Sequence, residues 1–250
     1  MGVDISPLIE HLKHEKEISD FSRQTIVFDA HNIIYQFLAS IRQSDGTPLM
    51  DLKGNITSHL SGLFYRNVRM MKYNITPMYV FDGKPPAFKK VLKEKEREKK
   101  IAETLMEKAK SHEIEEEQLL YAKQTLRLTK EMVEESIELL EALGINCFVA
   151  PSEGEAQAAY MVKKGIGHYS ASQDYDSLLF GSPVLVRNLS ISEKRKIPRK
   201  DMYVSVKPEV IILDEVLNKL EISLDHLIFI GIMIGTDFNE GIKGVGSKTA

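Results

Sequence analysis

The sequence predicts an α/β fold with a mostly parallel, doubly wound sheet flanked by helices. Short apolar runs, TIVF at 25–28, MYVF at 78–81 and INCFVA at 145–150, alternate with amphipathic helical patterns along the chain. Such alternation favours right-handed crossovers between neighbouring parallel strands. Acidic residues directly follow several of these runs, and ligands bind at the carboxyl ends of the strands in sheets of this kind. We therefore expect a binding site at that edge of the sheet.

The composition suits one large domain or two smaller lobes. With 250 residues and 43% hydrophobic content, the chain is long enough to bury a core. Cys147 is the single cysteine and lies in an apolar run, which predicts a buried small side chain in a reducing compartment. The longest apolar run, LIFIGIMIG, is far shorter than the roughly 20 residues that a membrane span needs. We therefore expect a soluble, cytoplasmic protein with no membrane partner.

The first two strands share one design. TIVF ends in Asp29 and precedes a helical pattern at 30–43. A turn-rich stretch then leads to a long amphipathic helix at 56–74, and Pro77 leads into MYVF, which ends in Asp82. The side chains expected on the apolar face of the long helix are Leu60, Leu63, Phe64, Val68 and Met71.

The segment after Asp82 changes character. The net charge of -3 and pI near 6.2 argue mildly against a nucleic-acid partner, yet residues 84–100 contain eight Lys or Arg. A charge run is by default a solvated helix with pairs such as Glu96 and Lys100. The alternative is an arch, from about 84 to 125, that presents cations to phosphates, and both interpretations can hold together. The cations concerned are Lys84, Lys89, Lys90, Lys93 and Arg97.

The second half repeats the alternation. An amphipathic helix at 128–144 closes at Gly144, a helix at 155–165 follows the third strand, and HYSAS at 168–172 and VLVRNL at 184–189 read as strands.

The last segment is an apolar helix ending near Gly235, followed by GIKGVGSK. We interpret this stretch as the start of a helix-hairpin-helix element whose backbone N-H groups bind a duplex phosphate. Lys243, Gly244, Gly246 and Lys248 are its candidate contacts. An ordinary glycine-rich turn is the alternative.

Six acids from four segments follow predicted strands. Glu153 with Glu155 and Asp174 with Asp176 are spaced i, i+2, which puts both on one side of an extended chain. Packed carboxylates repel unless a cation lies among them, and Mg2+ or Mn2+ prefers such oxygen ligands. For PSEGEA, a capping box with Ser152 as N-cap is equally open. Together with Asp29 and Asp82, the two pairs predict a metal site.

Six longer motifs carry a family resemblance. They are VFDAHNIIYQFL, DGTPLMD with TSHLSGLFYR, YVFDGKPP, APSEGEAQAAY, ASQDYDSLLFG and IGTDFNEGIKGVG. With them the sequence resembles the archaeal flap endonucleases, in the structure-specific 5′ nuclease superfamily. The resemblance implies flap endonuclease and 5′-3′ exonuclease activity on branched DNA in replication and repair. It also implies two Mg2+ ions about 3.5 to 4 Å apart, which Mn2+ can replace.

The resemblance also assigns roles to single residues. It implies catalytic roles for Lys89, at the scissile phosphate, and for Asp176, and it places Gly2 close to the site. The second basic residue of the family's arch falls at Glu96 here. The metal acids would be Asp29, Asp82, Glu153, Glu155, Asp174, Asp176 and Asp237. The implied DNA contacts are Gly2, Tyr35, Arg42, Arg66, Glu153, Gly235 and Asp237.

The family pattern continues beyond Ala250, so we expect a C-terminally truncated chain. Its regions would be an N-terminal nuclease region at 1–100 and an internal nuclease region at 115–250 that ends inside the helix-hairpin-helix. The resemblance implies a monomer beside the nucleoid, and a sliding clamp as partner of the full-length protein through a peptide absent here.

Two rival functions are weighed against this one. An aspartyl phosphatase needs a second Asp two residues after the first, which only Asp174 and Asp176 supply. The other rival is a non-catalytic junction-binding fragment, inactive because the C-terminal DNA-binding part is missing. Degenerate relatives would be expected to lose acids, and all seven are present here.

Overall fold

The computed structural model describes residues 2–43, 45–86, 128–189, 194–196, 203–247 and 249–250. Most of the predicted arch, from residue 87 onward, lies outside these residues. So do the candidate contacts Lys89 and Lys248 and the arch residues Lys90, Lys93, Glu96 and Arg97.

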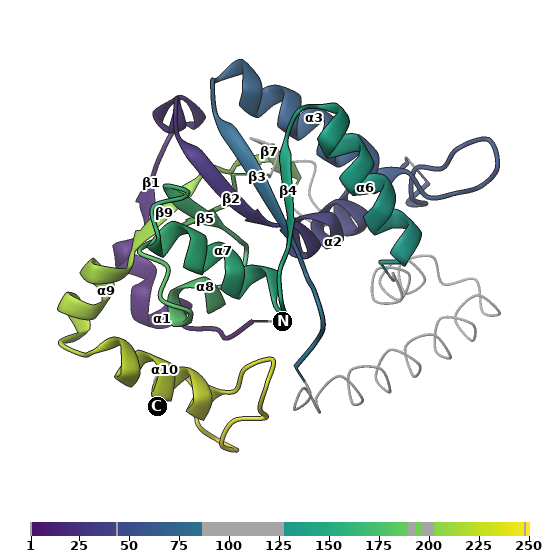
Figure 1. The fold of residues 1–250 in the computed structure, drawn as a ribbon. Coiled ribbons are helices and arrows are strands. Elements are labelled where there is room, and N and C mark those ends of the chain that lie inside the picture. The colour runs from purple at the N-terminus through teal and green to yellow at the C-terminus, as the bar shows by residue number, and fades with distance from the viewer. Residues whose placement is uncertain (1, 44, 87–127, 190–193, 197–202, 248) are drawn as a thin grey trace.

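The fold is built on one sheet, shown in Figure 1, with strand order β1-β9-β6-β5-β2-β3-β4 in the described part of the chain. The pairs β2 with β3, β2 with β5, β3 with β4 and β5 with β6 are parallel, whereas β9 is antiparallel to β1 and β6. The prediction of a mostly parallel, doubly wound sheet is therefore confirmed. The strands are β1 (His14–Glu15), β2 (Thr25–Asp29), β3 (Thr76–Phe81), β4 (Asn146–Val149), β5 (Tyr169–Ala171), β6 (Val184–Arg187) and β9 (Glu209–Ile212).

Alternation along the central strands separates two cores. Phe28 and Tyr79 stack on one face, with ring centroids 5.1 Å apart, within the cluster that the helices α2, α3 and α6 complete. Val27 and Val80 point to the other face and pack against α7. The helices of the first face are α2 (Ala30–Ser40), α3 (Ser58–Lys72) and α6 (Lys130–Ala142). Those on the other side of the sheet are α1 (Ser6–Ile9), α7 (Gly154–Lys163), α8 (Asp176–Leu179), α9 (Leu213–Leu220) and α10 (Leu224–Ile234).

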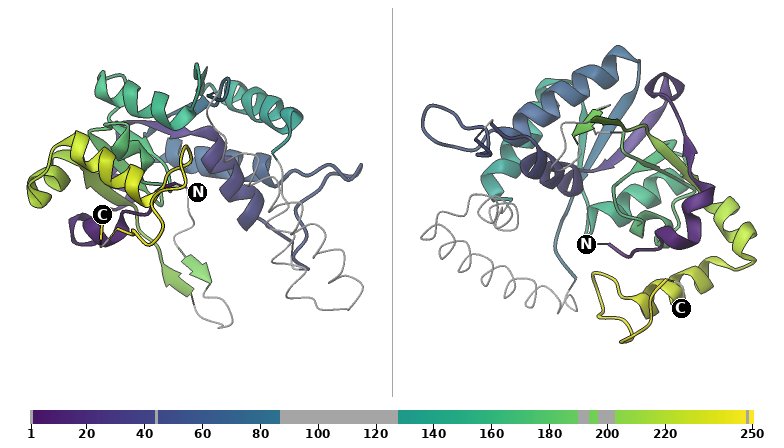
Figure 2. Two further views of the ribbon diagram at one scale, coloured as in Figure 1. Left: turned by 90° about the horizontal axis from the view of Figure 1, so that it is seen from below. Right: turned by 180° about the vertical axis from the view of Figure 1, so that it is seen from behind.

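Shorter elements complete the chain. The 3-10 turns η1 (Glu10–Leu12) and η2 (Ile18–Phe21) lead into the sheet, and β7 (Lys194–Lys196) pairs with β8 (Tyr203–Ser205) in a ribbon that projects from the body (Figure 2). The sequence patterns did not predict β9 or β1, which has only two residues. In the part described, no helix is long and apolar enough to cross a membrane.

The predicted apolar face of α3 is wrong for two of its residues. Phe64 and Val68 are 41% and 43% exposed, whereas His59 and Asn67 are fully buried. Asn67 pairs its amide with the carbonyl of Leu63 and with the Tyr79 hydroxyl, so its burial leaves no polar atom unmatched. Gly62 brings the ring of Phe37 so close that a Cβ would lie 2.3 Å from it. Hydropathy does not encode the hydrogen bonds of Asn67 or the close approach of Gly62 to Phe37. For this reason the buried face of α3 differs from the predicted one.

The predicted division at 1–100 and 115–250 stays a prediction, and residues from both regions contribute strands to the same sheet.

Candidate metal centre

The first two acids lie where the central strands end. Asp29 is the last residue of β2 and caps α2, since its Oδ1 accepts the N-H of Asn32 at 3.1 Å. Asp82 follows β3, and its Oδ1 accepts the N-H of Gly154 at 2.6 Å, at the start of α7. A Cβ on Gly154 would lie 3.0 Å from that oxygen and 2.9 Å from the Val80 carbonyl, so glycine lets the helix begin against the carboxylate.

Three more acids are tethered between α7, α8 and the N-terminal segment. Glu155 Oε1 accepts the N-H and hydroxyl of Ser177 at 3.0 and 2.8 Å. Asp174 Oδ2 accepts the amide of Asn32 at 2.8 Å. Asp176 Oδ1 accepts the N-H of Val3 at 2.7 Å. Segments far apart in sequence therefore hold the carboxylates at one edge of the sheet.

Gly2 lies against two of these acids. A Cβ at this position would lie 2.7 Å from the Cβ of Asp174 and 2.8 Å from Oδ1 of Asp176. The structure therefore brings Gly2 to the acidic edge, as expected from the resemblance, and leaves no room there for a larger residue.

Both predicted i, i+2 pairs take a different local form from the one expected. Glu153 is the N-cap of α7 without a side-chain cap bond, so the alternative capping box with Ser152 is wrong. Glu155 lies in the first helical turn and Asp176 is the first residue of α8, so neither pair lies on a fully extended chain. Carboxylates are favoured at helix N-termini because the helix dipole is positive there.

His31 joins the cluster without having been predicted. One ring nitrogen of His31 and one carboxylate oxygen each of Asp29 and Asp82 lie within 4.8 Å of one another. His31 Nδ1 accepts the N-H of Asp82 at 3.1 Å, and burial lowers the pKa of His31, which keeps the ring neutral. His31 therefore orients Asp82. Only its position two residues after Asp29, in FDAHN, could have pointed to it.

The electrostatics of the buried acids fit a divalent cation. Burial, and then the charge of Asp82, raises the pKa of Asp29 to about 7. Burial also raises the pKa of Glu155 well above its ordinary value, and that of Asp176 to about 6. Without added positive charge, these carboxyl groups bind protons at higher pH than ordinary carboxyl groups do. Carboxylate oxygens are the ligands that Mg2+ prefers, so the residues present match such an ion.

Two further acids border this group. The charge of Glu153 acts to raise the pKa of His31, against the larger lowering by burial. The charge of Asp237, in the turn after α10, contributes to the raised pKa of Asp176. A hollow of about 660 Å3 lies beside them between α7, α8 and α10. Its walls include Glu153, Asp176, Leu179, Phe180, Ile228, Ile232 and Phe238.

The candidate DNA contacts occupy several elements. Tyr35 is 46% exposed on α2, and Arg66 lies on α3, where burial lowers its pKa. Arg42 donates to the carbonyls of Gly46 and Leu38 at 3.2 Å each, so it also holds the loop after α2. Gly235 ends α10 at a φ of +109°, and Lys243, Gly244 and Gly246 follow in a turn region. The roles of these residues stay predictions, as does the helix-hairpin-helix.

Comparisons with known proteins follow the same segments. The XPG N-terminal domain matches residues 1–103 and the XPG I-region matches residues 144–237. Flap endonuclease 1 of Thermofilum pendens is 54% identical over 254 residues, covering 100% of this chain and 73% of that protein. Flap endonuclease 1 of Pyrococcus furiosus is 53% identical over 253 residues, covering 100% and 74%.

Solved structures show the same likeness. Flap endonuclease-1 from Methanococcus jannaschii superposes with a TM-score of 0.72 at 40% identity, covering 94% of this chain and 72% of that one. The catalytic core of Rad2 in complex with a DNA substrate reaches a TM-score of 0.70 at 23% identity, covering 98% and 65%, and supports the fold alone.

Proposed function

Because this chain belongs to the flap endonuclease family, we propose that it is a structure-specific 5′ flap endonuclease and 5′-3′ exonuclease of DNA replication and repair. It hydrolyses the phosphodiester at the base of a flap and leaves a 5′ phosphate. The observation that carries this function is the gathering of acids, among them the buried Asp29 and Asp176, at the carboxyl ends of β2 and β3 and at the starts of α7 and α8.

These acids would hold two divalent ions, with Mg2+ as the physiological ion and Mn2+ able to replace it. The residues concerned are Asp29, Asp82, Glu153, Glu155, Asp174, Asp176 and Asp237. Bound there, such ions lower the pKa of water and stabilise charge on the attacking and leaving oxygens.

The protein's own groups prepare this edge. The Gly154 N-H donates to the Asp82 carboxylate, Asn32 donates to Asp174, and the Val3 N-H donates to Asp176, so these three carboxylates have a defined direction before substrate arrives. Such preorganisation avoids the cost of reorganising charged groups during the reaction. Burial raises the pKa of Asp29 to about 7, so this carboxyl group would give up its proton in holding a divalent ion.

The substrate would meet this edge from several sides. Lys89 would add positive charge at the scissile phosphate, and Tyr35 would stack near the cleaved nucleotide. The apolar walls of the hollow next to Glu153 and Asp176 suit a nucleoside beside that bond. The remaining proposed DNA contacts are Gly2, Arg42, Arg66, Gly235, Lys243, Gly244, Gly246 and Lys248.

The finer features of the biology belong to the same proposal. We propose that the protein works as a monomer at the nucleoid and that its full-length form binds a sliding clamp. Both follow from the family resemblance.

The test is cleavage of an end-labelled double-flap DNA by the 250-residue chain. One Mg2+-dependent cut at the flap base, absent with EDTA, is expected. Asp176→Ala should abolish the cut and leave DNA binding measurable, whereas Asp51→Ala, on an exposed turn, should cut normally. Unchanged cleavage by Asp176→Ala would refute the proposed site. Robust turnover of p-nitrophenyl phosphate would instead favour an aspartyl phosphatase.

A further inference from the structure

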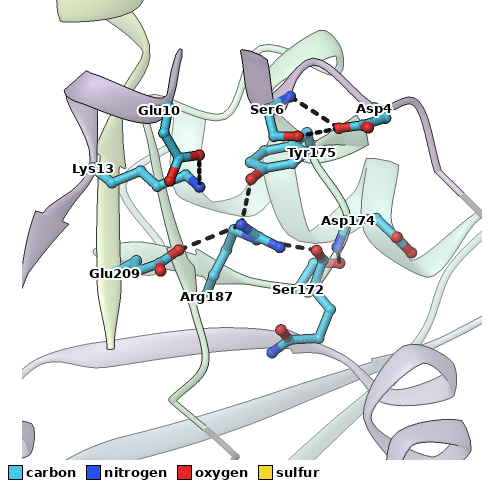
Figure 3. A network of polar contacts seen from close by, with 10 residues as sticks. Asp4, Ser6, Glu10, Lys13, Ser172, Asp174, Tyr175, Arg187 and Glu209 are labelled. Atoms are coloured by element: carbon cyan, nitrogen blue, oxygen red, sulfur yellow. Dashed lines mark hydrogen bonds and ion pairs between the residues drawn. The ribbon is translucent and has the colours of Figure 1, made fainter. Parts of the chain in front are cut away.

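One arginine reaches the segment that carries Asp174 and Asp176 without being near them in sequence. Arg187 is the last residue of β6 (Figure 3). Its Nε donates to the Gln173 carbonyl at 3.1 Å, and its Nη1 donates to the Tyr175 hydroxyl. The guanidinium carbon lies 4.2 Å from the centre of the Tyr175 ring. A single side chain thus contacts the residue before Asp174 and the residue between the two acids.

The arginine is itself firmly held. Glu209 of β9 pairs with it in register across the sheet, and their side chains approach to 3.4 Å. The Arg187 side chain is only 18% exposed, so this contact is partly shielded from water. Tyr175 is 5% exposed and packs in the core formed by Val3, Ile5 and Leu178. Arg187 is therefore fixed by its contact within the sheet, and Tyr175 is fixed by the core around it.

The contacts of Arg187 with Gln173 and Tyr175 oppose electrostatic repulsion within the loop that carries Asp174 and Asp176. Asp174 and Asp176 are carboxylates of like charge separated by a single residue. Repulsion of this kind pushes two carboxylates of a short loop apart unless the backbone between them is held. Asn32 holds one end, by accepting the Gln173 N-H at 3.3 Å, and Glu155 holds the other through Ser177. Tyr175 lies between these ends and is held by Arg187.

We propose that Arg187 is a positioning residue of the metal centre, which fixes the directions of Asp174 and Asp176 by holding Gln173 and Tyr175 together. This inference rests on the proposed function, since it takes these two acids as metal ligands. Arg187 touches neither carboxylate in the contacts described, so it acts through the loop.

The geometry separates this role from a simple charge effect. A guanidinium presents several N-H donors in one rigid plane, so it can bind the carbonyl and the hydroxyl while stacking on the ring. A lysine ammonium carries the same charge as a compact, flexible point and cannot do all three. If position matters, lysine does not replace Arg187; if only charge matters, it does.

The experiment measures Mn2+ binding to the DNA-free chain by electron paramagnetic resonance of the free ion. Arg187→Met and Arg187→Lys should each weaken Mn2+ binding by about 10- to 100-fold, the usual effect of losing a residue that orients ligands. Tyr175→Phe, which removes only the hydroxyl, should weaken it by about fivefold. The control is Lys207→Met, which also removes one positive charge but pairs with Glu17, away from the loop. It should bind Mn2+ within about twofold of the parent.

Thermal unfolding in EDTA, followed by circular dichroism, checks that each variant is folded. If Arg187→Met does not fold, Tyr175→Phe and Arg187→Lys carry the test. Parent-like Mn2+ affinity in folded Arg187→Met, or full rescue by lysine, would overturn the inference and leave the metal centre standing. Absence of Mn2+ binding by the unmodified chain would refute the metal centre itself and the inference with it.

Discussion

Removal of divalent metal should make the stability of this protein depend on pH in an unusual direction. Most native carboxylates have lowered pKa values, so proteins gain stability as pH rises from acid. Here burial raises the pKa of Asp29 to about 7 and that of Asp176 to about 6, from an ordinary value of 3.8. The folded chain therefore binds more protons than the unfolded chain between these values. Its free energy of unfolding should fall as pH rises through this window.

The magnitude follows from the window that can be measured. Asp29 has a pKa of about 7, so about two pH units of the range from pH 5 to 7.5 lie below this pKa. Each of these units lowers the free energy of unfolding by about 1.4 kcal/mol. This contributes a loss of about 3 kcal/mol. Asp176, with a pKa of about 6, adds about 1 kcal/mol. The sum of about 4 kcal/mol counts these two acids alone; Glu155, whose pKa is also raised, acts in the same direction, and interacting acids titrate together rather than independently.

The assay is urea unfolding of the chain in EDTA at pH 5 and pH 7.5, repeated with excess Mg2+. We expect lower stability at pH 7.5 in EDTA, and a difference that disappears or reverses with Mg2+, because the ion binds only the folded, deprotonated cluster. Asp29→Asn should lose most of the pH dependence, whereas Asp45→Asn, on an exposed turn, should keep it. Equal or greater stability at pH 7.5 in EDTA would refute the reasoning.

Three further predictions concern packing around the same edge. Gly2→Ala places a Cβ 2.7 Å from the Cβ of Asp174, so it should weaken Mn2+ binding by at least about tenfold while the unfolding temperature stays within about 2 °C; parent-like binding in the resonance assay would contradict this. Gly154→Ala should cost about 1 to 3 kcal/mol in urea unfolding, because its Cβ would lie 2.9 Å from the Val80 carbonyl. Gly246→Ala, with open space around it, is the control and should be neutral. Asn67→Ala should cost about 2 kcal/mol or more by leaving the buried Tyr79 hydroxyl unpaired, and a double-mutant cycle with Tyr79→Phe should give a coupling of about 1 kcal/mol; strictly additive effects would show that this hydrogen bond contributes nothing.

Local sequence patterns predicted the fold class and the edge of the sheet at which the candidate site lies. Side chains alternate with a period of 2 residues in a strand and 3.6 residues in a helix. These periods show in consecutive residues, so the alternation of strands and helices could be predicted from the sequence. Parallel strands bring their carboxyl ends to one edge, and for that reason Asp29 and Asp82, from separate segments, could be expected to meet before any distance was known.

Tertiary structure alone decided which atoms meet at that edge. Arg187 reaches Gln173 because β6 lies beside β5, and Asn32 reaches Asp174 across 142 positions of sequence. His59 and Asn67 are buried on α3 against the hydropathy of their own helix, where His59 Nε2 pairs with Glu135 of α6 and Asn67 accepts the Tyr79 hydroxyl of β3. Contacts of this kind depend on the packing of distant segments, and no short-range period encodes them. The sequence by itself therefore determined the kind of fold and the acidic edge, while only the packed structure decided the direction of each carboxylate and the residues that hold it.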